Sequence, residues 1–209
     1  ILAGGAGKRL GGEKPFRPLQ GKALIEHVIG RVLPQVSRTW ISARVDDQSF
    51  RRLGLPIVED ERASETGGPL AGMVAGIEAA ASFGFDTVAI FPCDVPFLPA
   101  DLVSKLERSL LQSEAPGIIV SSGGVLQPTI GLWQTSSRGL LRAALRGGRR
   151  KLHLVCIEVG AAVLDASEAR WPVHAFFNVN TAFDMARAEA YGRLRTMPAI
   201  RAPMGRPLT

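Results

Sequence analysis

The residues best suited to chemistry stand at the start of the chain, in the glycine-rich run 2–15, Leu-Ala-Gly-Gly-Ala-Gly-Lys-Arg-Leu-Gly-Gly-Glu-Lys-Pro. Glycines that follow a strand let backbone N–H groups approach a ligand closely, and such groups bind phosphate. Lys8, Arg9 and Lys14 add cations that neutralise phosphate charge. The run therefore predicts a loop that binds a polyphosphate. A flexible loop with a solvated basic face is the alternative interpretation.

Two common phosphate-binding motifs do not fit this run. A dinucleotide fingerprint that starts at Gly5 requires Gly or Ala at position 10, which is Leu. A P-loop requires a glycine five residues before Gly7, where Leu2 stands, and Ser or Thr after Lys8, where Arg9 stands. The predicted phosphate loop is thus of a different type.

A carboxylate, Asp94, follows the apolar run Thr87–Phe91 in the segment 92–99, Pro-Cys-Asp-Val-Pro-Phe-Leu-Pro. Open α/β sheets bind ligands beyond the carboxyl ends of their strands. Mg²⁺ takes one or two carboxylates from a protein, and phosphates and water supply its other ligands. Asp94 fits the role of a Mg²⁺ ligand, but by itself it is more readily interpreted as a turn residue beside proline. Cys93 has no histidine nearby, so we interpret it as a packing residue and expect no zinc.

The elements that position these residues alternate between short apolar runs and longer segments of helical periodicity. The expected strands are Ile1–Ala3, Thr39–Ala43, Leu55–Glu59, Thr87–Phe91, Gly117–Ser121, Pro128–Leu132, Val155–Val159 and Phe176–Val179. The expected helices are Leu24–Leu33, Pro69–Ala81, Ala100–Gln112, Arg138–Leu145 and Thr181–Ala190. This alternation predicts an α/β fold, a three-layer sandwich in which helices cover both faces of a mostly parallel sheet.

Length and composition limit the organisation and the function class. The chain of 209 residues is large enough for one domain with a full hydrophobic core, which we place at residues 1–190. Residues 191–209 are expected to form a weakly ordered basic tail, because the segment 193–209 carries four Arg, three Pro and no acid. The net charge of +6 favours anionic ligands.

Nucleic acid and membranes are not expected as partners. Aromatic residues make up only 6% of the chain, so few platforms exist on which bases could stack. No apolar stretch is long enough to cross a bilayer. The two cysteines, Cys93 and Cys156, show no pairing pattern, which favours the reducing cytoplasm.

The opening run and the Asp94 segment together resemble the molybdenum cofactor guanylyltransferases. These enzymes belong to a larger group of nucleotidyltransferases that open with a similar glycine-rich loop. The resemblance is carried by Leu-Ala-Gly-Gly-x-x-x-Arg-x-Gly-Gly, then an acid and Lys14, and by Pro-Cys-Asp-x-Pro-Phe-Leu-Pro. It covers roughly residues 1–190 and implies a Rossmann-like nucleotidyltransferase fold. The family usually has one more residue before its Asp-Lys pair, so Glu13 and Lys14 are a slight departure.

The resemblance also implies roles for the residues that hold the nucleotide. Asp60 matches an Asp that contacts the nucleotide, and the segment 68–72, Gly-Pro-Leu-Ala-Gly, lies beside the base and the ribose in the family. By themselves, Asp60 would pass for a turn residue and Gly68 for a helix start. Two positions depart from the family: Arg44 stands where Asn is frequent, and Gln127 where His is common.

The second substrate is assigned to residues late in the chain. The segment 177–181, Phe-Asn-Val-Asn-Thr, matches a family motif, and we assign Asn178 and Asn180 to molybdopterin. Asn180 faces the metal or this substrate in one interpretation, and in the other Asn180 or Thr181 only caps a helix. Arg149 and Arg150 are similarly assigned to the pterin's phosphate, although cations after a helix also complement its C-terminus.

The reaction that the resemblance implies is attack by the terminal phosphate of molybdopterin on the α-phosphorus of GTP, with release of pyrophosphate. Mg²⁺ is the expected cofactor, and the product would pass to molybdoenzymes or their chaperones. The expected catalytic residues are Arg9, Lys14 and Asp94. The expected GTP-binding residues are Leu2, Ala3, Gly4, Gly5, Lys14, Asp60, Gly68 and Asp94. A cytidylyltransferase, a sugar-nucleotide pyrophosphorylase and a nucleotide-binding regulator without turnover remain as alternatives.

Overall fold

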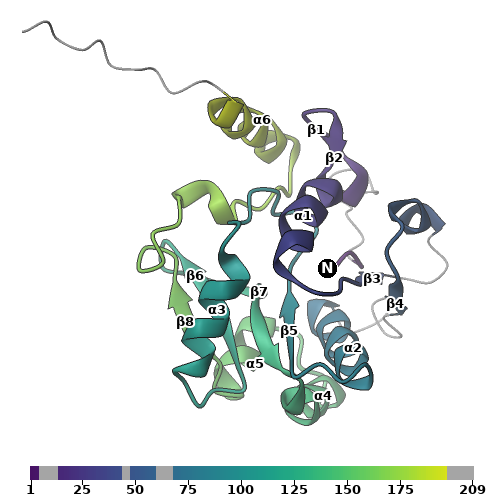
Figure 1. Cartoon of the computed structure of the whole chain (residues 1–209), viewed down its shortest axis with the longest axis vertical. Helices are drawn as coiled ribbons and strands as arrows, with labels where there is room; N and C mark the ends of the chain where they lie inside the picture. The colour runs from purple at the N-terminus through teal and green to yellow at the C-terminus, as the bar shows by residue number, and fades with distance from the viewer. Residues whose placement is uncertain (5–13, 44–47, 60–67, 197–209) are drawn as a thin grey trace, which may run out of the picture.

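Two sheets meet side by side on the segment Ile1–Ala3 in the computed structural model, which describes residues 1–4, 14–43, 48–59 and 68–196 (Figure 1). The first sheet pairs β3 (Ile41–Ala43) with β4 (Ile57–Glu59) in parallel. The second has the order β5 (Thr87–Ile90), β7 (Val125–Gln134), β6 (Gly117–Ser122) and β8 (Ala162–Asp165). Leu2 bridges the two sheets, because it pairs in parallel with Ser42 and with Pro92.

The joined sheet is mixed because one strand runs against its neighbours. β7 is antiparallel to both β5 and β6, whereas β6 and β8 are parallel, as are β3 and β4. The carboxyl ends of β5, β6 and β8 therefore lie at the same edge. The predicted α/β class is confirmed, with the antiparallel β7 placed inside the sheet.

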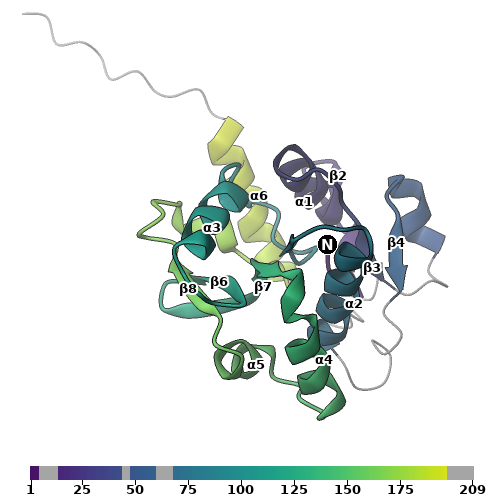
Figure 2. The same cartoon turned by 60° about the horizontal axis from the view of Figure 1, so that its bottom comes forward.

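Helices cover both faces, and the alternation of side chains along β6 decides which face each helix covers. Ile118 and Val120 belong to one hydrophobic cluster, with α1 (Leu24–Val32) and α3 (Leu102–Leu111). Ile119, which lies between them, belongs to another, with α2 (Gly68–Ser82), α4 (Arg138–Arg146) and α5 (Leu152–Glu158). Figure 2 shows α1 and α3 on one side of this sheet and α4 and α5 on the other. The predicted three-layer sandwich is confirmed.

Smaller elements complete the described chain. A short antiparallel hairpin joins β1 (Pro18–Leu19) and β2 (Lys22–Ala23), and α6 (Ala182–Thr196) lies against it. The 3₁₀ turns are η2 (Lys14–Phe16), η3 (Leu33–Gln35), η4 (Gln48–Leu53), η5 (Thr135–Ser137) and η6 (Val173–Phe176). Within the residues that the structure describes, no helix is both long and apolar enough to cross a membrane.

Two strand predictions are wrong. The run Val155–Val159 lies in helix α5 and the segment after it, with Val155 and Cys156 buried and Ile157 exposed. A short apolar run is compatible with either a strand or a helix, and here the next strand is β8, which the sequence did not reveal. Phe176–Val179 forms the end of η6 and an irregular segment, because its Val179 N–H bonds to the Asp94 carbonyl instead of to a strand.

The helix α6 continues to Thr196, so the predicted domain boundary at residue 190 falls inside it. Its start is as predicted. The Asp184 N–H bonds to the Thr181 hydroxyl at 3.1 Å, and the Asp184 carboxylate accepts from the Thr181 N–H at 2.9 Å. This reciprocal pair is a capping box. Residues 197–209 of the predicted tail lie outside the described residues.

The sheet also contains a glycine on which an indole ring lies, and this generates a prediction about stability. A Cβ at Gly117 would lie 2.3 Å from Cε3 of Trp133, whose side chain is fully buried. We expect Gly117→Ala to lower the free energy of unfolding by about 1–3 kcal/mol through overpacking.

Urea unfolding of both variants measures this effect. The matched control is Gly139→Ala in helix α4, where an added Cβ meets nothing within 4 Å. That change should be neutral or should stabilise by up to about 1 kcal/mol. Equal stability of the two variants would show that the Trp133 ring does not constrain Gly117.

Candidate active site

Three distant parts of the chain meet at the carboxyl edge of the sheet. The Lys14 ammonium forms an ion pair with the Asp94 carboxylate and donates to the Asn180 side-chain oxygen at 2.6 Å. The Lys14 and Asp94 side chains are only 14% and 12% exposed. We call Lys14, Asp94 and Asn180 the polar cluster. Its charges are mostly withdrawn from water, where their electrostatic effect on a ligand is strongest.

The backbone around Asp94 is fixed on two sides. On one side, the Leu2 N–H bonds to the Phe91 carbonyl at 2.7 Å and the Cys93 N–H to the Leu2 carbonyl at 3.1 Å. On the other, the Asp94 carbonyl accepts from the Val179 N–H at 2.9 Å. The carboxylate therefore projects from a rigid frame and not from a loose turn, as the functional interpretation of Asp94 requires.

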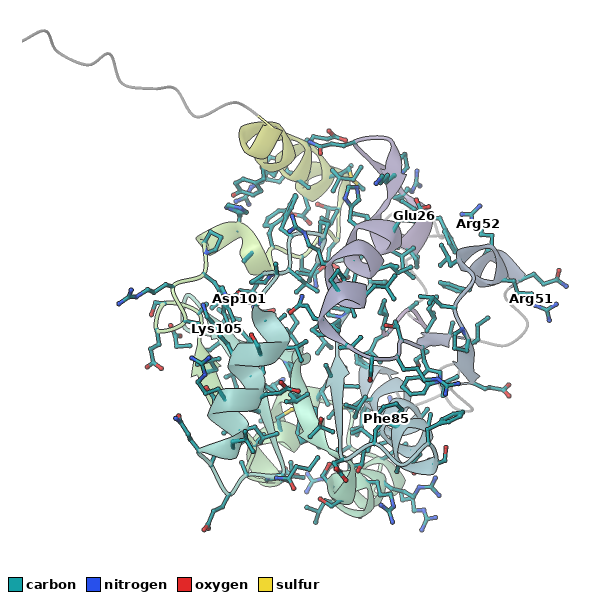
Figure 3. All side chains as sticks on the ribbon, in the orientation of Figure 1. Glu26, Arg51, Arg52, Phe85, Asp101 and Lys105 are labelled. Atoms are coloured by element: carbon teal, nitrogen blue, oxygen red, sulfur yellow. The ribbon has the colours of Figure 1, made fainter. Side chains whose placement is uncertain are left out.

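Lys14 is delivered by the short turn η2, which follows the glycine-rich run. Pro15 in this turn is buried, and the Phe16 ring packs at 5.0 Å against that of Phe50. The Arg52 guanidinium lies 4.2 Å from the Phe16 ring centre, and Figure 3 labels Arg52 on η4. These contacts hold the Lys14 backbone in place, so its long side chain reaches inward from an anchored base.

Two buried oxygen atoms at this edge lack a hydrogen-bond partner among the described residues. They are Oδ1 of Asp94 and Oδ1 of Asn178. A buried acceptor without a donor costs free energy, so such atoms are frequent where a ligand or a cation binds. A carboxylate oxygen and amide oxygens are also the donor atoms that Mg²⁺ prefers. The edge thus offers oxygen atoms of the kind that a divalent cation binds.

The structure separates two roles that the sequence left open for Asn180 and Thr181. The Thr181 hydroxyl caps α6, while the Asn180 side chain is turned away to Lys14. Burial acts to raise the pKa of the Asp184 carboxyl, but hydrogen bonds from Thr181 and from the Asn180 backbone outweigh it and lower the pKa. Asp184 therefore serves the cap as a carboxylate, and the Asn180 amide is available to the site.

Cys93 does not serve as a nucleophile in this geometry. Burial raises the pKa of its thiol to about 12, and the neighbouring Asp94 carboxylate adds to the rise. The reactive thiolate is therefore disfavoured. Cys93 packs in a cluster with Ile25 and Ile41, in agreement with its interpretation as a packing residue. The described residues contain no group of three or more His, Cys, Asp or Glu suited to a metal.

Other predicted nucleotide residues lie at the same edge or outside the described chain. Leu2, Ala3 and Gly4 lead from the sheet toward the glycine-rich run, and Ala3 is buried. Gly68 begins α2 with a φ of 52°, a left-handed conformation that suits glycine. Outside the described residues lie Gly5, Arg9, Arg44 and Asp60.

No contact among the described residues links Arg149 or Arg150 to the polar cluster. Arg149 follows α4 and forms an ion pair with Glu158 at 3.3 Å, and both side chains are largely exposed. Arg150 is exposed. In Figures 1 and 2, the connection between α4 and α5 lies well away from α6. Their assignment to the pterin's phosphate stays a prediction.

Comparison with known proteins fits this arrangement. Residues 1–159 match the model of the MobA-like NTP transferase domain. A molybdenum cofactor guanylyltransferase of Cereibacter sphaeroides is 38% identical over 192 residues, which cover 91% of this chain and 94% of that protein. A relative of the same name in Acidiphilium cryptum is 36% identical and covers 91% and 92%. This chain belongs to the molybdenum cofactor guanylyltransferase family.

A solved structure supports the family assignment. Molybdopterin-guanine dinucleotide biosynthesis protein A of Archaeoglobus fulgidus superposes with a TM-score of 0.78 at 25% identity, covering 92% of this chain and 97% of that one. The Rossmann-like nucleotidyltransferase fold implied by the opening run is therefore confirmed. These matches span nearly all of each chain.

Sequence reasoning identified each member of the polar cluster but not their contacts. It assigned Lys14 to phosphates, Asp94 to a metal and Asn180 to an acceptor or a cap, and the structure shows that Lys14 contacts both of the others. No local spacing signals this, because Lys14 is 80 residues from Asp94 and 166 from Asn180.

The division of labour between Asn180 and Thr181 predicts different effects on stability. Thr181→Ala should lower the free energy of unfolding by about 1 kcal/mol, because it removes the helix cap. Asn180→Ala should cost clearly less, because Thr181 and Asp184 still close the cap. Urea unfolding at pH 7 compares the two. An equal loss in both variants would show that Asn180 is part of the cap after all.

Proposed function

We propose that this chain transfers GMP from GTP to molybdopterin, forming molybdopterin guanine dinucleotide and releasing pyrophosphate. The observation that carries the proposal is the polar cluster, a lysine held between a carboxylate and an amide at the carboxyl edge of the sheet. Relatives at 36–38% identity over most of the chain are named guanylyltransferases, which supports guanine as the base. The cytoplasm is the proposed compartment, and the free, buried thiols of Cys93 and Cys156 fit it.

In the proposed reaction, an oxygen of the terminal phosphate of molybdopterin bonds to the α-phosphorus of GTP. The bond between the α-phosphorus and the bridging oxygen of the β-phosphate breaks, and pyrophosphate leaves with that electron pair. The protein forms no covalent intermediate, so its task is to position two anions and to neutralise their charge. Lys14 suits this task, since its ammonium is anchored by η2 and is withdrawn from water.

The nucleotide is proposed to lie at the carboxyl edge of the sheet, near the first residues of the chain. Leu2, Ala3 and Gly4, the described start of the glycine-rich run, lie beside this position. Gly68, which has no side chain, begins α2. Gly5, Arg9 and Asp60 remain part of this proposal, with Arg9 offsetting charge on the leaving pyrophosphate. Asn178 and Asn180 are proposed to contact molybdopterin. Arg149 and Arg150 are kept as candidates for its phosphate, although Arg149 already pairs with Glu158.

Mg²⁺ is the proposed cofactor. Asp94 would hold it, since one carboxylate oxygen lacks a partner among the described residues and faces the same edge as the Asn180 amide. When bound, the ion would neutralise phosphate charge and polarise the α-phosphate. In this structure Lys14 pairs with the carboxylate, so the negative charge of Asp94 is compensated in a largely desolvated site.

The purified chain with Mg²⁺, molybdopterin and either GTP or CTP tests the function directly. Pyrophosphate release and the dinucleotide product are measured together. We expect turnover with GTP and little with CTP, and no pyrophosphate release above background when molybdopterin is omitted. Preference for CTP would assign the chain to a cytidylyltransferase instead, and GTP binding without turnover would favour a regulator.

Substitutions in the polar cluster test which residues carry the reaction. Asp94→Asn should abolish turnover while the chain stays folded, because Asn has nearly the same shape and its amide oxygen can still accept from Lys14. Lys14→Ala should weaken GTP binding by about 1.5–3 kcal/mol, the usual contribution of a charge-assisted hydrogen bond. Pyrophosphate release, calorimetric titration with GTP and thermal unfolding are measured for each.

A second lysine–aspartate pair supplies the matched control. Lys105 and Asp101, both labelled in Figure 3, form an ion pair on α3, and Asp101 also accepts from the Trp171 indole. Asp101→Asn and Lys105→Ala remove the same chemical groups away from the polar cluster and should leave turnover and GTP affinity unchanged. Wild-type turnover in Asp94→Asn, or unchanged GTP affinity in Lys14→Ala, would refute the corresponding role.

A further inference from the structure

A group of aromatic rings around one arginine lies next to the polar cluster and has no role in the reaction described so far. We call Phe177, Phe183, Arg187 and Tyr191 the aromatic face of α6. The Arg187 guanidinium carbon lies 4.8 Å from the centre of the Phe177 ring and 6.0 Å from those of Phe183 and Tyr191. Arg187 also donates to the Tyr191 hydroxyl at 3.2 Å. The guanidinium is therefore held in a fixed position among three rings.

The aromatic face is continuous with the polar cluster along the chain. Phe177 directly precedes Asn178, and Phe183 follows Asn180 by three residues, less than one turn of helix. Asn180 itself accepts from Lys14, and the segment between the two asparagines bonds to the Asp94 backbone. In Figure 1, α6 lies beyond the end of the sheet toward which β5 points. The segment that meets Lys14 thus continues directly into this face.

Packing explains only part of this face. Tyr191 stacks on the His174 ring at 5.3 Å and meets Phe97 edge-on, which fixes the inner side of the face. Phe183 is different, because 71% of it is exposed and it contributes little to the core. A rigid inner layer and an exposed ring beside a guanidinium suit a flat aromatic ligand that carries negative charge.

We propose that the aromatic face of α6 binds the pterin ring system of the acceptor, with Phe183 stacked on the ring and Arg187 beside its anionic substituents. The inference rests on the proposed function. Molybdopterin joins a reduced pterin, whose pyrimidine ring is flat, to a terminal phosphate, and in the proposed function that phosphate reacts at the polar cluster. Its ring must then lie a short distance away, and the aromatic face, which carries the Arg187 guanidinium, follows the cluster directly along the chain.

Single substitutions on the exposed part of the face test the proposal. Phe183→Ala should raise the KM for molybdopterin on the order of tenfold, the usual effect of losing one stacked ring. GTP affinity, measured by calorimetry, should not change, and Phe183→Tyr should restore the KM. Arg187→Lys keeps the charge but loses the planar guanidinium, so it should also raise the KM. A fluorescent pterin without phosphate should bind wild type and bind Phe183→Ala less well.

An exposed phenylalanine elsewhere provides the matched control. Phe83 is 54% exposed and lies 3.9 Å below the Arg38 guanidinium, at the opposite end of β5 from the polar cluster. Phe83→Ala should leave the KM for molybdopterin unchanged. The proposal is overturned if Phe183→Ala has a wild-type KM, if it loses GTP affinity instead, or if Phe83→Ala behaves the same way. A wild-type chain that makes no dinucleotide would overturn the proposed function itself, which is a separate outcome.

Discussion

The backbone hydrogen bonds of Leu2 and Ala3 are the constraint on which the site depends. These two residues form hydrogen bonds with Ser42 on one side and with Phe91 and Cys93 on the other. They therefore hold β3 and the segment after β5 side by side, one on each side of the first residues of the chain. Gly4 follows this joint on one side, and Asp94 directly follows Cys93 on the other. Because the joint is made of main-chain bonds, it fixes the backbone of Ala3 and of Cys93 independently of their side chains.

The polar cluster fixes the position of charged side chains on this backbone frame. A half-buried ion pair contributes little to net stability, but breaking it leaves an uncompensated charge, which is costly. The ion pair therefore holds Lys14 at the position where anions are to be bound. The Asn180 side-chain oxygen accepts a second hydrogen bond from the Lys14 ammonium. A site organised in this way spends little free energy on rearrangement when a charged substrate arrives.

The general architecture could be predicted because apolar periodicity and the strand–helix alternation act locally. Asp94 was predictable as well, since its place after a buried run defines its position at the sheet edge. The helical nature of Val155–Val159 was not predictable, because five apolar-rich residues carry no decisive period and only the packing of Val155 and Cys156 against the sheet selects the helix. The contact of Lys14 with Asn180 and the aromatic face of α6 were equally hidden, because both depend on how distant segments pack.

The span of the polar cluster along the chain has a consequence for biosynthesis. The cluster needs both Lys14 and Asn180, which is made 166 residues later. A chain emerging from the ribosome forms its first strands and helices long before Asn180 is available. The half-built protein therefore exposes Lys14 and Asp94 without their amide partner, and it gains a complete site only when α6 docks on the hairpin near Gln20. The cluster of three residues is thus completed only after the segment that carries Asn180 has been made.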